Sequence, residues 1–484
     1  MNTDAPWPSL DEARARVLKI QAKLHQWATD SPDRRFCDLS NLVCDPAFLM
    51  VGWDRVRGNR GARTAGVDGV KPRSIDRDGG EFLRELRDDL KARRFAPLPV
   101  RERMIPKTSG KLRRLGIPTA RDRVVQASLK LVLEPIFEAD FEPCSYGFRP
   151  KRRAQDAIEE IRHFSARSYE WILECDIASC FDEISHPALM DRVRRRVGDP
   201  RVVGLVKAFL IAGILSEDGA LRGSKSGTPQ GGILSPLLAN IALSALDEHY
   251  AETWRTSMAS DHDRKRRRRR GEPMYRLVRY ADDFVVLVSG TKAQAEALKV
   301  DIAAVLSTMG LRLSAEKTGV CHIDEGFDFL GFRIQRQVKR GSNKEFVYSW
   351  PCKQALASIM AKIKTITRQG TNNPLSTLLR QINAALRGWT VYFRHGVSKQ
   401  TFGYLGHYTW QRVIRWLRRK HRRASWRSIR GRYLLAITAN TLVPHDDGVT
   451  LFNPASVAVT RYHYRGTKIA TPWTERTKTT TAEQ

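Results

Sequence analysis

Two short apolar runs, separated by a turn with two adjacent aspartates, constrain the fold of this chain more than any other feature. Leu277–Tyr280 is expected to form one strand, and Phe284–Val288 a second, more buried strand. Ala281, Asp282 and Asp283 then occupy the tip of a tight hairpin. Neighbouring carboxylates repel each other unless a cation neutralises them, and oxygen ligands suit Mg²⁺. A solvent-exposed Asp-Asp turn is the plain alternative, so the hairpin alone does not establish a metal site.

A third carboxylate stands at the end of another apolar run. The segment Trp171–Asp176 is expected to form a strand, and a helix is expected to begin at His186-Pro187. An aspartate at the end of one strand, beside a hairpin that carries two more, supplies the ligands of a two-metal site. Such a site activates a 3′-hydroxyl and stabilises the leaving pyrophosphate of an in-line displacement. Together, the three carboxylates predict nucleotidyl transfer.

These segments resemble the polymerase motifs of reverse transcriptases. The Tyr-Ala-Asp-Asp box that ends at Asp283 resembles the metal-binding box of that family, and the segment around Asp176 resembles its first catalytic aspartate. The resemblance implies that Asp176, Asp282 and Asp283 are the catalytic residues. It also implies that these aspartates, together with Ile177, bind two Mg²⁺ ions.

Further blocks follow in the order that the family shows. The segments around residues 105–118 resemble a hairpin that faces the incoming triphosphate, and in segment 227–236 Ser235 is expected to cap a helix. The resemblance implies a dNTP-binding set and a primer grip. The dNTP-binding residues are Lys107, Arg113, Phe181, Gln230 and Lys317, and the primer grip is Phe329, Leu330 and Gly331. Phe181 resembles the steric gate that excludes a ribose 2′-hydroxyl. Taken singly, the cations would also suit a solvated edge strand, and Phe181 would also suit a position in the hydrophobic core.

Two regions narrow the resemblance to the reverse transcriptases encoded by group II introns. Ala65–Gly69 resembles their N-terminal extension, and Ile382–Phe393 resembles the thumb, or X, domain that is linked to maturase activity. Trp410–Arg432 interleaves tryptophans with cations, which suits RNA and equally a helical bundle with core tryptophans. The cationic run Arg264–Arg270 is expected to stay unfolded until RNA orders it, with a solvated loop as the alternative. The RNA-binding residues expected are Arg266, Arg267, Arg268, Arg387, Trp389, Arg418, Arg419 and Lys420.

The alternation of short β-rich runs with helices predicts an α+β fold. The resemblance implies a right-hand polymerase, with fingers and an antiparallel palm sheet, followed by an α-helical thumb or maturase domain. We expect an N-terminal extension at 1–95, fingers and palm at 96–335, and the thumb and maturase domain at 336–435. Residues 436–484 are expected to form a basic C-terminal segment that could serve as a short DNA-binding region.

The charge balance points to a polyanionic partner. The chain has 83 Lys and Arg residues against 52 Asp and Glu, which gives a formal net charge of +31. We therefore expect group II intron RNA, a DNA target or primer and dNTPs as partners. The seven cysteines include no Cys-x-x-Cys pair, so a zinc knuckle is not expected. No secretory leader is recognised, and the apolar stretch Leu234–Leu246 is too short to cross a bilayer, so we expect a bacterial cytosolic protein.

The sequence thus predicts the RNA-directed DNA polymerase and maturase of a bacterial group II intron. An RNA-binding splicing factor without polymerase activity is one alternative, which the intact aspartates disfavour. A domesticated reverse transcriptase in defence or CRISPR adaptation is another, although no fused integrase-like or primase-like domain is recognised. Many relatives carry a C-terminal HNH nuclease with paired cysteines, and no such segment is recognised here. Priming from nascent strands at a replication fork is therefore expected, and the sequence leaves a homodimer open.

Overall fold

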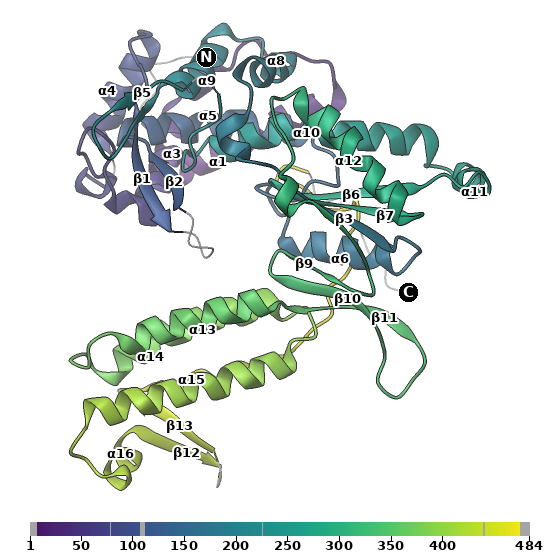
Figure 1. Cartoon of the computed structure of the whole chain (residues 1–484). Coiled ribbons are helices and arrows are strands. Elements are labelled where there is room, and N and C mark those ends of the chain that lie inside the picture. The colour runs from purple at the N-terminus through teal and green to yellow at the C-terminus, as the bar shows by residue number, and fades with distance from the viewer. Residues whose placement is uncertain (1–6, 78, 107–111, 225, 439–440, 475–484) are drawn as a thin grey trace, which may run out of the picture. The chain divides into compact units, whose positions relative to one another are not determined.

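The structure, a computed structural model, describes residues 7–77, 79–106, 112–224, 226–438 and 441–474, and it forms two compact units (Figure 1). The first unit comprises residues 1–153, 172–320 and 465–484, and the second comprises residues 154–171 and 321–464. Each unit is therefore assembled from segments that lie far apart in the sequence. Helices and sheets are mixed, as the α+β prediction requires. Within the described ranges, no helix combines the length and apolar character needed to cross a membrane.

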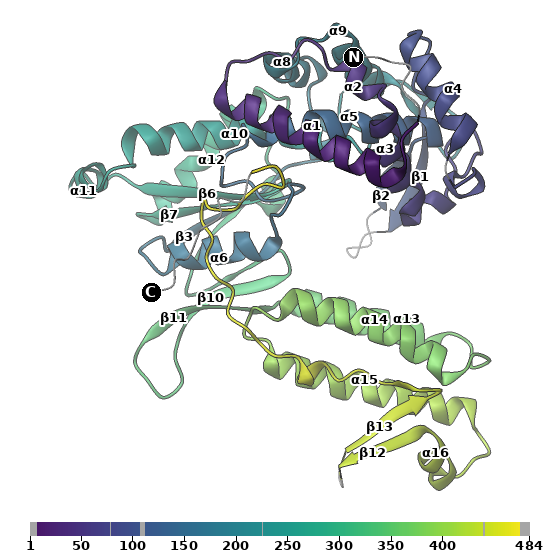
Figure 2. The ribbon, with the colours of Figure 1, turned by 180° about the vertical axis from the view of Figure 1, so that it is seen from behind.

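Helices form the N-terminal part of the first unit, where α5 (Ala120–Glu138) is almost entirely buried. The helices around it are α1 (Leu10–Asp30), α2 (Ser40–Val43), α3 (Pro46–Gly58) and α4 (Gly80–Lys91), with short 3-10 turns at Arg60–Arg63 and Pro72–Ser74. The first three pack against α5 and α4 packs against α3; Figure 2 shows α1 from its open side. A capping box of Ser9 and Glu12 begins α1, and Thr119 with Asp122 begins α5 in the same way.

Two four-stranded sheets complete the framework of the first unit. One has the order β2-β1-β4-β5, and the other has the order β6-β7-β3-β8. The first sheet contains β1 (Val100–Pro106), β2 (Leu112–Ile117), β4 (Ile214–Leu215) and β5 (Leu221–Arg222). The second contains β3 (Trp171–Asp176), β6 (Met274–Tyr280), β7 (Asp283–Ser289) and β8 (Gly319–His322). The predicted hairpin is β6–β7, and residues 284–288 of β7 are all buried.

Five helices and a 3-10 turn connect and cover these strands. They are α7 (Cys180–Glu183), α8 (His186–Arg196), α9 (Pro200–Ile211), α10 (Ser235–Ser257), α12 (Lys292–Ser307) and the turn Ala315–Lys317. The long helix α10 packs against α5, α8, α12 and strand β6. It therefore links the N-terminal helices to the sheet that carries the aspartates.

The cationic run at 264–270 is ordered, and the expectation that it stays unfolded without RNA is wrong. It forms most of α11 (Asp261–Arg269), in which no residue is buried. Ser260 caps the helix by accepting the N–H of Asp263. Lys265 pairs with Asp261 at 2.9 Å, and Arg266 pairs with Asp263 at 3.2 Å. The cap and these one-turn ion pairs offset the repulsion among the cations, which explains why a helix forms.

The second unit combines a three-stranded sheet with a helical bundle. The sheet has the order β11-β10-β9 and packs against α6 (Ala154–Ser165). Its strands are β9 (Phe327–Phe329), β10 (Phe332–Val338) and β11 (Glu345–Pro351). The bundle contains α13 (Lys353–Arg368), α14 (Leu375–Phe393), α15 (Lys399–Lys420) and α16 (Trp426–Tyr433). A small sheet follows, with β12 (Leu434–Thr438), β13 (Thr441–Asp446) and β14 (Val449–Thr450), and then a 3-10 turn at Pro454–Ser456.

The sequence left open whether the tryptophans of Trp410–Arg432 are core residues or surfaces for RNA. The structure assigns a different role to each of Trp410, Trp416 and Trp426. Trp416 is fully buried in the core formed by α13–α16, and Trp410 packs against that core while donating to the Leu442 carbonyl at 2.8 Å. Trp426 is exposed, with the guanidinium of Arg418 5.1 Å from its ring centroid. Two of the three tryptophans are therefore structural, and only Trp426 presents an aromatic surface.

Candidate catalytic site

The structure brings Asp176 to the hairpin that carries Asp282 and Asp283. Asp176 is the last residue of β3, and Asp283 is the first residue of the neighbouring strand β7. Asp282 lies in the two-residue turn between β6 and β7, where Asp283 pairs with Tyr280. Three carboxylates from positions more than 100 residues apart are thus gathered at one end of one sheet.

The charges at this end of the sheet repel each other. Desolvation and the negative charges of Asp282 and Asp176 together raise the pKa of Asp283 to about 6, although Lys317 acts in the opposite direction. Lys317 contacts Asp176 directly, with 3.0 Å between Nζ and Oδ2. The site therefore holds excess negative charge that one lysine only partly neutralises.

The donor atoms fit a divalent cation, although their present arrangement does not form a complete metal site. Within the described ranges, no group of three or more His, Cys, Asp or Glu side chains is placed to hold a metal ion. Oxygen-only ligands and mutually repelling carboxylates are what Mg²⁺ favours. The Ile177 carbonyl is a further oxygen next to Asp176. It takes no part in the bridge to Leu313, whose hydrogen bonds use the Ala178 N–H and the Asp176 carbonyl.

The turn that carries Asp282 has an unusual backbone. Ala281 has a φ of 59°, a left-handed conformation that alanine rarely adopts. Its nitrogen lies against Gly147, where a Cβ atom would come within 2.2 Å of it. Only glycine fits at position 147, so the loop at 144–148 packs directly on the turn. The Tyr146 N–H also donates to the Arg279 carbonyl at 2.9 Å.

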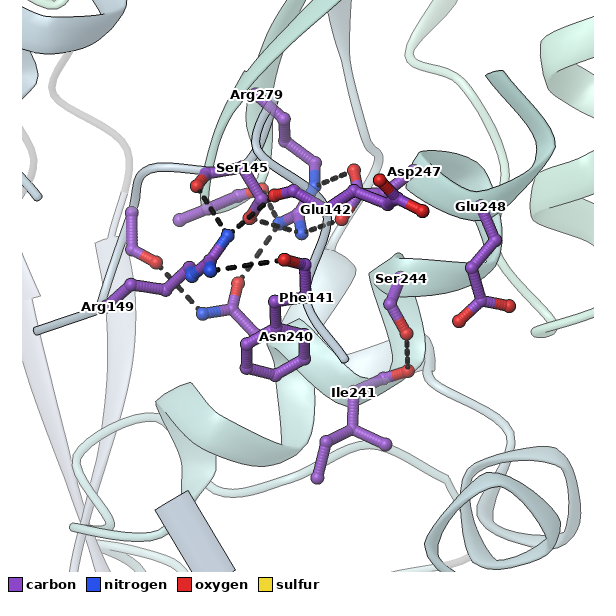
Figure 3. Close-up of polar contacts among 12 residues, drawn as sticks. Phe141, Glu142, Ser145, Arg149, Asn240, Ile241, Ser244, Asp247, Glu248 and Arg279 are labelled. Atoms are coloured by element: carbon purple, nitrogen blue, oxygen red, sulfur yellow. Dashed lines mark hydrogen bonds and ion pairs between the residues drawn. The ribbon is translucent and has the colours of Figure 1, made fainter. Parts of the chain in front are cut away.

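A fully buried arginine, Arg279, holds this turn in place, and Figure 3 shows it next to Asp247, Asn240 and Ser145. The guanidinium of Arg279 forms a two-pronged ion pair with Asp247, in which Nε lies 2.7 Å from Oδ1. It also donates to Asn240 Oδ1 at 3.0 Å, to Ser145 Oγ at 2.7 Å and to the Ala281 carbonyl at 2.9 Å. Burial opposes its charge, but Asp247 outweighs the burial and raises the pKa of Arg279. The turn is thus attached to α10 by a charged network of fully buried side chains.

Sequence reasoning missed Arg279, Asp247 and Asn240. The available signal was a single cation among the apolar residues of a strand next to the aspartates. A charge in such a position needs a buried partner. The sequence did not show which of the 52 acidic residues supplies it.

Two of the predicted nucleotide-binding residues contact each other. Arg113 on β2 is exposed, and its Nε donates to Gln230 Oε1 at 2.7 Å. The Gln230 carbonyl in turn accepts the Gly116 N–H at 2.7 Å. β2 and the segment before α10 therefore form one surface that carries both side chains. Lys107 lies outside the described residues.

Phe181 is buried on α7 and contacts Phe148, with 6.5 Å between the ring centroids in an edge-to-face arrangement. Its carbonyl accepts the Thr228 N–H at 2.6 Å.

The prediction that Ser235 caps α10 is wrong, because Ser235 is already the first helical residue. Its hydroxyl donates to the Pro229 carbonyl at 2.8 Å, so it closes the loop at 227–234 on itself.

The predicted primer-grip residues lie in the second unit, between β9 and β10. Leu330 and Gly331 have φ values of 48° and 79°, and they form a tight turn after Phe329. The Leu330 carbonyl accepts the Tyr392 hydroxyl at 2.9 Å, and the Gly331 carbonyl accepts the Cys352 N–H at 2.9 Å. This turn is therefore held by both α14 and the start of α13.

The predicted RNA-binding residues fall into two groups. Arg266, Arg267 and Arg268 lie on α11, where Arg266 and Arg267 already pair with carboxylates and Arg268 is exposed. In the second unit, Arg387 stacks over Phe452 at 4.5 Å. Trp389 is half-buried against Phe393, so it acts mainly in packing.

The remaining predicted cations lie near a cationic cavity of the second unit. Arg419 donates to the Thr367 carbonyl at 2.6 Å, and Lys420 donates to the carbonyls of Thr371 and Asn373. Arg418, one residue earlier, is exposed and stacks on Trp426. The cavity measures about 800 Å³, and its lining includes no acidic residue within the described ranges. Its cations are Arg368, Arg419, Lys420, Arg422 and Arg423.

Two protein families match the chain. The reverse transcriptase (RNA-dependent DNA polymerase) family matches residues 105–334, and the maturase-specific domain of group II introns matches residues 356–434. Protein YkfC of Escherichia coli strain K12 is 37% identical over 357 residues, which cover 70% of this chain and 93% of that protein. The group II intron-encoded protein LtrA of Lactococcus lactis is 31% identical over 365 residues, which cover 66% of this chain and 60% of that protein.

Among solved structures, a telomerase from Candida albicans in complex with a fragment of telomeric RNA aligns at a TM-score of 0.39 and 14% identity. The alignment covers 70% of this chain and 61% of that chain. A likeness this weak carries no argument here.

Proposed function

Because the chain belongs to the family of group II intron-encoded reverse transcriptases and maturases, we propose that it copies intron RNA into DNA and assists the splicing of that RNA. The observation that carries the polymerase part is the gathering of Asp176, Asp282 and Asp283 at one end of a sheet. The partners of the proposed reaction are the intron RNA as template, a DNA primer and dNTPs. The intron is proposed to be bacterial, and the protein to act in the cytosol.

In this proposal Asp176, Asp282, Asp283 and the Ile177 carbonyl hold two Mg²⁺ ions. When bound, the ions lower the pKa of the primer 3′-hydroxyl and take up charge on the leaving pyrophosphate. Lys317 donates a hydrogen bond to Asp176 Oδ2, and because its side chain is exposed it can contact a phosphate instead. The lysine thereby keeps the site partly neutral before substrate arrives and contacts the triphosphate afterwards.

The chain's own side chains select and orient the nucleotide. A hydrogen bond joins Arg113 to Gln230. We assign Arg113 to the triphosphate, and Gln230 to the sugar and the template strand. The buried ring of Phe181 is held against Phe148 and serves as the barrier to a ribose 2′-hydroxyl. Lys107 completes the set of phosphate-binding cations. We place the fingers and palm at residues 96–335.

The primer grip is assigned to Phe329, Leu330 and Gly331, and the maturase part to residues 336–435. The acid-free cavity at the end of α13 and α15 supports RNA binding, because cations without carboxylate partners favour a phosphate backbone. The exposed face of Trp426 beside Arg418 adds a surface on which a base can stack.

The double variant Asp282→Asn with Asp283→Asn tests the proposed polymerase activity. We expect cDNA synthesis on a primed RNA template to fall below detection, because the amides cannot replace two charged metal ligands. The protein's assistance to intron splicing should remain within about twofold of the wild type, since the splicing surface is assigned to residues 336–435. Chelation of Mg²⁺ from the wild-type protein should also stop cDNA synthesis.

Asp191→Asn is the matched control, since Asp191 is an exposed carboxylate of the same unit that pairs with Arg194 at its surface. It should leave cDNA synthesis unchanged. Undiminished cDNA yield from the double variant would remove these aspartates from the reaction and with them the proposed polymerase site.

A further inference from the structure

A cavity of about 560 Å³ opens in the first unit, and none of the residues that line it belongs to the proposed polymerase site. It is enclosed by the start of α1, the segment between α2 and α3, the C-terminal half of α4, and α9. Its volume lies within the range of roughly 300–1,000 Å³ that is typical of small-molecule sites. The question is what chemistry this cavity would accept.

The lining of the cavity is strongly cationic. Five cations line it within the described part of the chain, against a single carboxylate, that of Asp45. The cations are Arg16, Arg87, Lys91, Arg93 and Arg201. Both oxygens of Asp45 are engaged, one by the Ala47 N–H at 2.8 Å and the other by Arg16 at 2.7 Å. The lining therefore carries more positive than negative charge, and Arg201 also pairs with the buried carboxylate of Asp199, which does not line the cavity, with 3.5 Å between Nε and Oδ1.

Three of these cations surround Cys44. Arg87 Nε donates to the Cys44 carbonyl at 3.3 Å. Burial raises the pKa of the Cys44 thiol to about 11, whereas Arg201, Arg87 and Lys91 act on it in the opposite direction. The thiol is thus neutral at physiological pH and supplies no negative charge. An anion entering the cavity meets the positive charges of Arg87, Lys91 and Arg201, of which Arg201 is already paired with Asp199.

The other wall is apolar. Leu90, Phe95, Leu205 and Ala208 line the cavity, and the Phe95 ring is fixed by Phe209, with 6.0 Å between the centroids. An aromatic ring that is held in place, next to cations, suits a ligand with a flat apolar part and an anionic part. Inorganic phosphate alone would leave the apolar wall uncovered.

Gly204 is a position at which a side chain can be added toward the cavity. It lies inside helix α9 and lines the cavity, yet a Cβ atom at this position would meet nothing within 4 Å. Glycine weakens a helix interior relative to alanine. Since neither packing nor backbone conformation demands glycine here, the position accepts a small side chain, whereas a bulky side chain would project into the cavity.

We propose that this cavity binds a nucleotide, with its phosphate among Arg87, Lys91 and Arg201 and its base against Phe95. The nucleotide is either free or an unpaired nucleotide of a bound RNA strand, since both present the same phosphate and base. This site is separate from the aspartates and does not depend on the proposed polymerase activity.

The test is calorimetric titration of the full-length protein with adenosine 5′-monophosphate, in EDTA so that no metal-dependent nucleotide site contributes. We expect saturable binding to the wild type that Gly204→Ala leaves within about twofold and Gly204→Phe abolishes, because only the phenylalanine fills the cavity. Arg87→Ala should weaken binding about tenfold, which corresponds to one charge-assisted contact. Arg84→Ala is the matched control on the same helix, since Arg84 is exposed and does not line the cavity.

A second arm separates the two sources of the nucleotide. If adenosine monophosphate gives no heat, a five-nucleotide single-stranded RNA should still bind the wild type at least about tenfold more tightly than it binds Gly204→Phe. Thermal unfolding checks that Gly204→Phe folds. If it does not fold, the affinities of Arg87→Ala and Arg84→Ala for the same ligand are compared instead. The proposal is wrong if neither ligand distinguishes the variants, or if inorganic phosphate binds as tightly as the nucleotide.

Discussion

Arg279 makes no contact with solvent, yet it lies only three residues before Asp282. Its hydrogen bond to the Ala281 carbonyl holds a backbone conformation that costs about 1 kcal/mol or more for a residue other than glycine. The strain persists because Asp247 fixes the guanidinium and Gly147 leaves room for the turn. The direction in which Asp282 points therefore depends on a residue that touches no substrate.

Replacing Arg279 with lysine tests this positioning role. Lysine keeps the charge but cannot form the two-pronged pair with Asp247 and also reach Ala281. We expect the rate of cDNA synthesis to fall more than about tenfold and the Mg²⁺ concentration for half-maximal activity to rise, because the proposed ligands are no longer held in place. A Mg²⁺ titration of single-nucleotide incorporation measures both effects.

Arg196→Lys is the control for reduced stability. Arg196 is equally a buried arginine of the first unit, and it pairs with Asp140 at 3.1 Å without contacting the hairpin. It should lower the unfolding temperature without shifting the Mg²⁺ dependence. The same Mg²⁺ curve for both variants would show that Arg279 only stabilises the fold.

At the scale of elements, α11 shows how local interactions can overcome a run of like charges. The helix is capped by Ser260 and braced by the carboxylates of Asp261 and Asp263 in its first turn. Its last turn carries only arginines, and all of them except Arg267 are exposed. A preformed helix loses less conformational entropy on binding RNA than an unfolded segment does.

Replacing Arg268, Arg269 and Arg270 with serine should weaken RNA binding and flatten its salt dependence. The slope of log affinity against log salt should fall by about one for each phosphate that the protein no longer neutralises. Ser260→Ala provides the contrast, since it weakens the helix by about 1 kcal/mol but keeps every cation. Binding measured at several salt concentrations decides the matter, and an unchanged slope in the triple-serine protein would show that the arginines do not bind RNA.

In the molecule as a whole, the proposed catalytic aspartates and the proposed splicing surface belong to different compact units. The aspartates and their supporting network lie in the first unit, and the acid-free cationic cavity lies in the second. A net charge of +31 favours RNA over the entire surface, so the total affinity for RNA does not identify the splicing surface.

Substitutions at the cavity of the second unit should separate splicing from polymerisation. Arg422→Ser with Arg423→Ser removes two exposed lining cations and is expected to reduce assisted splicing about tenfold or more. cDNA synthesis on an oligonucleotide-primed template should change by less than about threefold. Arg427→Ser, an exposed cation on α16 outside the cavity, should leave splicing unchanged. An equal decrease in both activities would contradict the proposed division.

Features that depend on neighbouring residues could be predicted from the sequence alone. The hairpin of β6 and β7 follows from two apolar runs around a two-residue turn, and the capping box of α1 follows from Ser9 and Glu12. The strand that ends at Asp176 was predicted in the same way. The unfolded arginine run was predicted wrongly, because repulsion was counted without the cap and the acidic first turn.

Only the tertiary structure decided which distant groups meet. Asp247 and Asn240 reach Arg279 because α10 crosses behind the sheet, and the cationic cavity exists because α1, α4 and α9 converge around Cys44. Local periodicity specifies which face of an element is buried but not which other element covers it. That choice belongs to the packing of the whole chain, since the partner of a buried charge is selected by the free energy of the complete fold.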